Sequence, residues 1–210
     1  MRDESRGMRR GFSLVEMLVV MGILAVLIGA GLTTFSSSTK KAQKARGQEL
    51  VSNVAVALEK IYQDEGSWPR QILAASGSEK GLDETVAYAL AKRKAMTLSS
   101  DDKLKKTTKL DRFGIVTPWA QDVIRRKGES GASEGTMVPS GGTIADHRLR
   151  FAVDTEGRGM VTASVGGESV TIRGSVMVWC CGQDGQLERY KDGLRRDDVY
   201  SWSDRQRVKQ

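Results

Sequence analysis

The residue that most clearly needs a chemical explanation is Glu16, a carboxylate inside an apolar stretch that runs from Phe12 to Leu32. An ionised carboxylate in a lipid-compatible helix is costly, so such a residue is by default a functional hypothesis. The chemistry open to it is pairing with a positive group, because a well-formed buried ion pair costs far less than either charge alone. If the chain were cut before Phe12, the new amine would supply such a group to a neighbouring copy's Glu16. The alternative is an ordinary membrane anchor that tolerates one glutamate near its end.

The position of Gly11 indicates which part of this stretch a peptidase would remove. In a secretory signal peptide the small residues follow the apolar region, and cleavage removes that region. Here the small residue comes before the apolar region. The order predicts that residues 1–11 are a cytoplasmic leader that is removed and that the apolar helix is kept. A side chain at Gly11 would obstruct a peptidase that has to fit the backbone closely.

The remaining reactive side chains do not form a catalytic pattern. Cys180 and Cys181 are adjacent, so they have no metal-binding spacing and cannot close a loop. The two cysteines could form a vicinal disulfide or remain thiols. We favour the interpretation that they are small residues of a strand and that at least one of them is buried. His147 is the single histidine, and we expect it at the surface. The sequence therefore predicts that the protein is not an enzyme.

Composition and charge exclude other classes of function. The formal net charge is +7, which attracts nucleic acid, anionic lipid or acidic polymers. The basic residues are nevertheless spread along the chain among acidic ones, without interleaved aromatic residues, so the pattern does not favour nucleic-acid binding. Aromatic residues make up 6% of the chain, which limits the soluble part to a modest core.

The hydrophobic pattern predicts one long helix with two halves. Residues 12–35 contain an apolar run of about 20 residues, the length of a helix that spans a membrane. Residues 36–66 continue the helix as an amphipathic half, because apolar residues recur at steps of three and four from Leu50 to Tyr62. Gly66 and Pro69 are expected to end the helix. Lysines and arginines flank both ends of the span, so charge alone does not orient it.

The rest of the chain predicts an α+β domain. Residues 67–146 form a variable region with short helices near 83–94 and from Pro118 to about 126, the second capped by Thr117, and a mobile Gly/Ser-rich loop at 128–142. Residues 147–187 alternate apolar and polar positions between glycine turns, which predicts an antiparallel sheet of about three or four strands laid on the amphipathic half of the helix. Residues 188–210 are a polar C-terminal loop and tail.

At the N-terminus, residues 11–16 (Gly-Phe-Ser-Leu-Val-Glu) resemble the prepilin peptidase motif of type IV pilins and type II secretion pseudopilins. The resemblance implies a pilin-like fold, cleavage between Gly11 and Phe12 by prepilin peptidase, and N-methylation of Phe12. It also implies that Glu16 sets register during assembly with copies of itself and other pilins or pseudopilins on an inner-membrane assembly platform. The protein would cross the inner membrane once, with its C-terminal domain in the periplasm or in an extracellular filament.

Weaker similarities point to the major-pseudopilin branch of this family. They are the end of the long helix from Tyr62 to Pro69, the pair Phe113-Gly114 with Pro118-Trp119, and two C-terminal segments, 182–185 and 198–202. In that branch the C-terminal loop often binds calcium, and Asp184 and Asp198 are the candidate ligands here. Arg195 and Arg196 stand where an acidic ligand is expected, and calcium prefers a shell of oxygens that includes several carboxylates. A solvated loop of mixed charge is therefore the favoured alternative to a calcium site.

Two functions follow from these observations. The first is a structural subunit of a type IV pilus or a type II secretion pseudopilus that polymerises through its N-terminal helix. The alternative is a membrane-tethered exported protein that binds a polyanion or DNA and does not polymerise. A tether has no need of Gly11, Phe12 and Glu16 in this arrangement, so this motif favours the first function.

Overall fold

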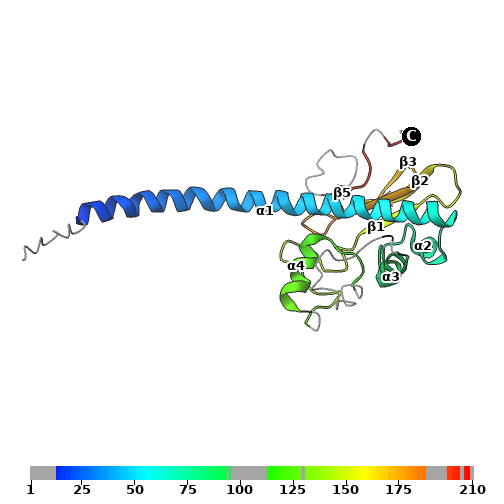
Figure 1. Cartoon of the computed structure of the whole chain (residues 1–210), viewed down its shortest axis with the longest axis horizontal. Helices are drawn as coiled ribbons and strands as arrows, with labels where there is room; N and C mark the ends of the chain where they lie inside the picture. The colour runs from blue at the N-terminus through cyan, green and yellow to red at the C-terminus, as the bar shows by residue number, and fades with distance from the viewer. Residues whose placement is uncertain are drawn as a thin grey trace, which may run out of the picture. The chain divides into compact units, whose positions relative to one another are not determined.

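The computed structural model describes residues 13–93, 95, 113–128, 131–187, 198–203 and 206–208, without the side chains of 28–37. The chain divides into two compact units, Met1–Ala42 and Gln43–Gln210. Figure 1 shows the order of the elements along the chain. The predicted leader and Phe12 lie outside the described residues.

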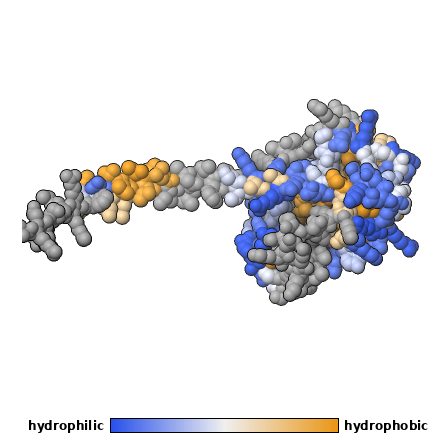
Figure 2. Space-filling view, in the orientation of Figure 1, coloured by the Kyte–Doolittle hydropathy of each residue, from blue (hydrophilic) through white to orange (hydrophobic). Residues whose placement is uncertain are grey.

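The long helix predicted from the sequence is α1, Leu14–Glu65. In the first unit the large apolar side chains between Leu14 and Leu27 are exposed, as the orange surface of Figure 2 shows. Among the residues that can be described, no helix is both long enough and apolar enough to span a membrane. Phe12 and the side chains of 28–35, which belong to the predicted span 12–35, lie outside this description.

From Gln43 onward the amphipathic half of α1 belongs to the second unit, and its apolar stripe forms part of the core, as the sequence predicts. Five positions of the stripe are at most 2% exposed: Val51, Val54, Ala57, Leu58 and Ile61. They pack in one cluster with Leu149, Phe151 and Val178. The helix ends where predicted, because Gly66 has a φ of +67° and donates its backbone N–H to the carbonyl of Tyr62.

The predicted α+β fold is confirmed, with a sheet arrangement that the sequence did not predict. Strands β1 (Arg150–Val153), β4 (Val176–Cys180) and β5 (Val199–Tyr200) form an antiparallel sheet in the order β1-β4-β5. Strands β2 (Met160–Val165) and β3 (Glu168–Arg173) form a separate hairpin. The region 147–187 thus holds four described strands, but β5 lies in the predicted C-terminal loop. A two-residue strand is too short to show alternation.

Three shorter helices complete the second unit. The structure has α3 (Glu84–Lys92) and α4 (Pro118–Lys127) near their predicted positions, and α2 (Arg70–Ala75), which was not predicted. Pro118 occupies the first turn of α4 as expected. Thr117 occupies the N-cap position as predicted, but its side chain makes no capping hydrogen bond. Its hydroxyl bonds to His147 instead.

The loop predicted to be mobile at 128–142 is packed in its described part. Ala132 and Val138 are buried and share a core cluster with Trp119 and Val123 of α4. The sequence prediction rested on the glycine and serine content of the segment. The two buried apolar side chains outweigh that composition because their removal from water favours a packed arrangement.

Candidate functional site

Of the three predicted functional residues Gly11, Phe12 and Glu16, only Glu16 lies among the described residues. It lies in the first turn of α1 with an exposed side chain. A carboxylate at this end of a helix interacts favourably with the positive end of the helix dipole. Its neighbours Val15 and Met17 are apolar and exposed. The motif therefore presents one negative charge within an apolar surface. Gly11 and Phe12, the predicted cleavage and methylation positions, lie outside the described residues.

Within the second unit, two glutamines of α1 bond to residues of other elements. Gln48 donates from Nε2 to the carbonyl of Tyr200 at 2.9 Å, and Gln43 donates to a carboxylate oxygen of Asp122 at 3.1 Å. Between them Gly47 is buried, and a Cβ placed there would lie 3.6 Å from Val199. The apolar periodicity of the sequence does not indicate these three positions, because they lie outside the stripe. A glycine within an otherwise polar stretch of helix was the only available signal.

The end of α1 is tied to the β-sheet region through its aromatic motif. Tyr62 and Trp68 stack with their ring centroids 4.7 Å apart. The indole N–H of Trp68 donates to the backbone carbonyl of Asp154 at 2.8 Å. These contacts hold the chain reversal that follows Gly66. The aromatic residues of segment 62–69 therefore have a structural role in this fold.

Asp154 organises the turn between β1 and β2. Its two carboxylate oxygens accept backbone N–H groups of Glu156 at 3.1 Å and Gly159 at 2.6 Å. Burial by itself raises the pKa of Asp154, but hydrogen bonds from the backbone of the turn outweigh it and hold the pKa below its usual value. The carboxylate thus stabilises the turn.

The two predicted calcium ligands are occupied by protein donors. Asp198 is buried, and its oxygens accept the backbone N–H of Gly182 at 3.0 Å and the hydroxyl of Tyr200 at 3.1 Å. Asp184 accepts the backbone N–H of Gln186 at 2.9 Å. Within the described part of the chain, no three His, Cys, Asp or Glu side chains are grouped so that they would hold a metal ion. The described residues do not by themselves fit calcium, and a site at this loop stays a prediction.

His147 is fully buried, so the predicted surface position is wrong. Its Nε2 lies 2.9 Å from the carbonyl of Gly141, and its Nδ1 lies 2.9 Å from the hydroxyl of Thr117. The carbonyl can only accept, which assigns the proton to Nε2 and makes Nδ1 an acceptor from Thr117. The ring therefore joins the start of α4 to the loop before β1. Its isolation in the sequence gave no sign of this burial.

The cysteines are both buried thiols without a disulfide. Cys180 packs in the cluster that contains α1, whereas the Cys181 thiol donates to the carbonyl of Asp146 at 3.1 Å. Cys181 also lies 3.7 Å from Nδ1 of His147. Burial, aided by the negative charge of Asp198, raises the pKa of Cys181 to about 12. A thiol held protonated at neutral pH is a poor nucleophile, so this Cys–His contact serves packing.

Comparison with known proteins found two similarities. Residues 6–32 match the prokaryotic N-terminal methylation motif. The chain is also 28% identical to the type II secretion system protein H of Pseudomonas aeruginosa over 169 residues, which cover 75% of this chain and 91% of that protein. No solved structure matches significantly. The resemblance predicted from residues 11–16 is confirmed: the chain carries a prepilin-type N-terminal methylation motif and is similar over most of its length to a type II secretion protein.

Proposed function

We propose that this chain is a structural subunit, and not an enzyme, of a type II secretion pseudopilus or a type IV pilus. Prepilin peptidase cuts between Gly11 and Phe12, the new N-terminus of Phe12 is methylated, and α1 mediates polymerisation. The observation that carries the proposal is the methylation motif at residues 6–32. The similarity to a type II secretion system protein over 91% of that protein's length favours the secretion pseudopilus.

Glu16 is the assembly residue in this proposal. Before assembly, lipid surrounds the apolar first part of α1, and the single pass anchors the subunit in the inner membrane. On assembly, the carboxylate of Glu16 pairs with the amine of Phe12 of a neighbouring subunit. Pairing removes most of the cost of two buried charges, whereas a shifted register leaves both charges unpaired. The interaction thus selects one position of each subunit along the filament.

The proposed partners are the proteins that process the subunit and assemble it. The peptidase acts first, and the inner-membrane assembly platform then adds the processed subunit to copies of itself and other pseudopilins. The second unit, Gln43–Gln210, is the exported domain in the periplasm or on the filament. Its part of α1 is held by the buried apolar stripe and by Gln43 and Gln48.

Substituting Glu16→Ala tests the proposal. We expect processing to proceed and filament recovery in a sheared-cell or cross-linked membrane fraction to fall by at least about tenfold, because the unpaired amine of Phe12 remains in an apolar interior. Glu49→Ala is the matched control, since Glu49 is an exposed carboxylate on the same helix. Assembly of Glu16→Ala at the wild-type level would overturn the role of Glu16.

Mass spectrometry of the mature protein separates the proposal from a tether that never polymerises. We expect an N-terminal peptide that begins with methylated Phe12 in cells with an active prepilin peptidase. An intact leader in such cells would contradict processing and favour the tethered binding protein. If the subunits are processed but form no intersubunit cross-links through α1, polymerisation is contradicted and processing is not.

A further inference from the structure

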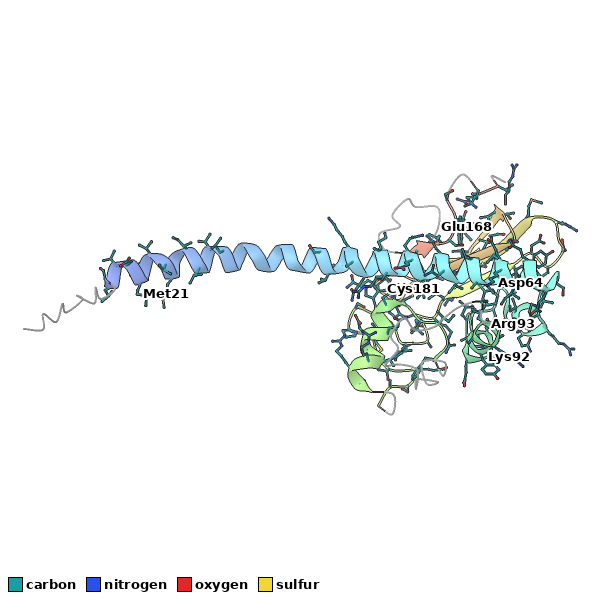
Figure 3. All side chains as sticks on the ribbon, viewed as in Figure 1. Met21, Asp64, Lys92, Arg93, Glu168 and Cys181 are labelled. Carbon is teal, nitrogen blue, oxygen red and sulfur yellow. The ribbon has the colours of Figure 1, made fainter. Side chains whose placement is uncertain are left out.

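A groove between α2 and α3 has no role in the proposed assembly. It consists of two cavities of 470 and 350 Å³, and both are lined by Gln71 and Thr85. We call it the α2–α3 groove. It belongs entirely to the second unit, and Lys92 and Arg93 mark its α3 side in Figure 3. Volumes of this size are typical of sites that take a ligand or several side chains of a peptide.

The cations in the lining of the groove outnumber its carboxylates. Arg70 and Lys80 line the first cavity and Lys92 lines the second. All three are exposed, and none of them takes part in an ion pair between described residues. With Arg93 they make four cations against the two carboxylates of the lining, and this excess of two positive charges attracts an anionic partner.

The two carboxylates in the lining are already committed to the fold. Glu65 forms an ion pair with Arg93, which also donates to the carbonyl of Ala89 at 3.3 Å. Asp83 accepts the backbone N–H of Val86 at 3.1 Å as the N-cap of α3. Both carboxylates are held in place by the fold and keep their negative charge, so they offset part of the positive charge of the lining. Tyr88 adds an aromatic side chain that is 61% exposed.

We propose that the α2–α3 groove binds an extended acidic segment of a partner protein. Carboxylates of the segment lie against Arg70, Lys80 and Lys92, and an apolar side chain packs on Tyr88. Such charge complementarity provides specificity and speeds encounter. The proposed occupant is a segment of a different protein, because the acidic residues of this chain are interspersed with basic ones.

An acidic peptide fits this lining better than a nucleic acid does. The committed carboxylates of Glu65 and Asp83 stand among the cations. A phosphate backbone, which carries a negative charge at every nucleotide, would meet these carboxylates along its path. The carboxylates of a peptide can be spaced so that they contact the cations and do not lie next to Glu65 or Asp83. This binding does not depend on polymerisation, so it can succeed or fail independently of the proposed function.

Fluorescence anisotropy on the full chain in detergent micelles tests the proposal. The probe is a fluorescein-labelled peptide of alternating glutamate and alanine with one central phenylalanine, and its matched control has glutamine in place of glutamate. The groove variant combines Arg70→Gln, Lys80→Gln and Lys92→Gln. The control variant removes the same charge at exposed positions elsewhere, with Lys60→Gln, Arg125→Gln and Lys127→Gln.

We expect the acidic peptide to bind about tenfold more weakly to the groove variant and within about twofold of wild type to the control variant. Thr85→Trp, which fills the space between the cavities without changing charge, should weaken binding as well. Equal losses in both charge variants would overturn the proposal, because they would indicate a general effect of net charge. Tighter binding of fluorescein-labelled single-stranded oligothymidine, lost in the groove variant, would assign the groove to nucleic acid instead.

Discussion

Gly114 is the position at which one added methyl group should disturb the domain most. Its φ is +72°, and a Cβ built there would lie 2.0 Å from the carbonyl oxygen of Leu82 and 2.9 Å from the Cα of Asp83. The neighbouring backbone is bonded, because Ile115 donates its N–H to the same carbonyl of Leu82 at 2.9 Å. In Gly114→Ala the two backbone segments must therefore separate.

The cost of Gly114→Ala follows from these contacts. The left-handed conformation costs a non-glycine residue about 1 kcal/mol, and loss of the Ile115–Leu82 hydrogen bond costs about 1 kcal/mol more. Displacement of packed neighbours adds about 1 kcal/mol, since Leu82 and Phe113 are at most 1% exposed. We expect the free energy of unfolding to fall by about 3 kcal/mol. Gly66→Ala should cost only about 1 kcal/mol, because its φ is +67° and no atom lies within 4 Å of its added Cβ.

Urea unfolding followed by tryptophan fluorescence measures both variants. All four tryptophans lie in the second unit, so the signal reports this unit and not the first. The two glycines share the sign and nearly the value of φ, and they differ in the space around the added methyl group. Equal losses in Gly114→Ala and Gly66→Ala would refute the steric argument. They would also mean that close packing does not require glycine at position 114.

Three further predictions concern buried and charged groups. Cys180 and Cys181 should not react with Ellman's reagent in the folded protein at pH 8 and should both react in denaturant, because both are buried and burial raises the pKa of Cys181 to about 12; rapid labelling of the folded protein would contradict this. The lowered pKa of Asp154 implies that its stabilising effect relative to Asp154→Asn is complete above about pH 4, the pKa of an unfolded aspartate, and disappears as pH falls through the lower folded pKa. The urea midpoints of wild type and Asp154→Asn should differ at neutral pH and converge in acid. A difference that stays constant with pH would show that the ionised carboxylate of Asp154 is not its cause. Millimolar calcium, compared with EDTA, should leave the melting temperature unchanged because donors of the chain already occupy Asp198; a rise that is lost in Asp184→Asn would establish a calcium site.

The features that could be predicted from the sequence are those encoded in short or periodic segments. The motif at residues 11–16 indicated the prepilin-type N-terminus by residue type alone, and residues 6–32 match the methylation motif. The apolar stripe from Leu50 to Tyr62 predicted both the amphipathic half of α1 and its burial. The hairpin of β2 and β3 was visible because alternation and its glycine turn lie within one continuous segment. Each of these signals arises within a few helical turns or strand residues.

Contacts between distant segments were decided only by the tertiary structure. His147 is buried because residues 117 and 141 supply its hydrogen-bonding partners. Asp198 is satisfied by Gly182, and Val199 and Tyr200 become a strand because β4 provides an edge with which to pair. A single histidine, an isolated aspartate and a two-residue strand show no periodicity. Their environment depends on which remote backbone groups must be satisfied once the core excludes water, and that requirement arises only after the chain has folded.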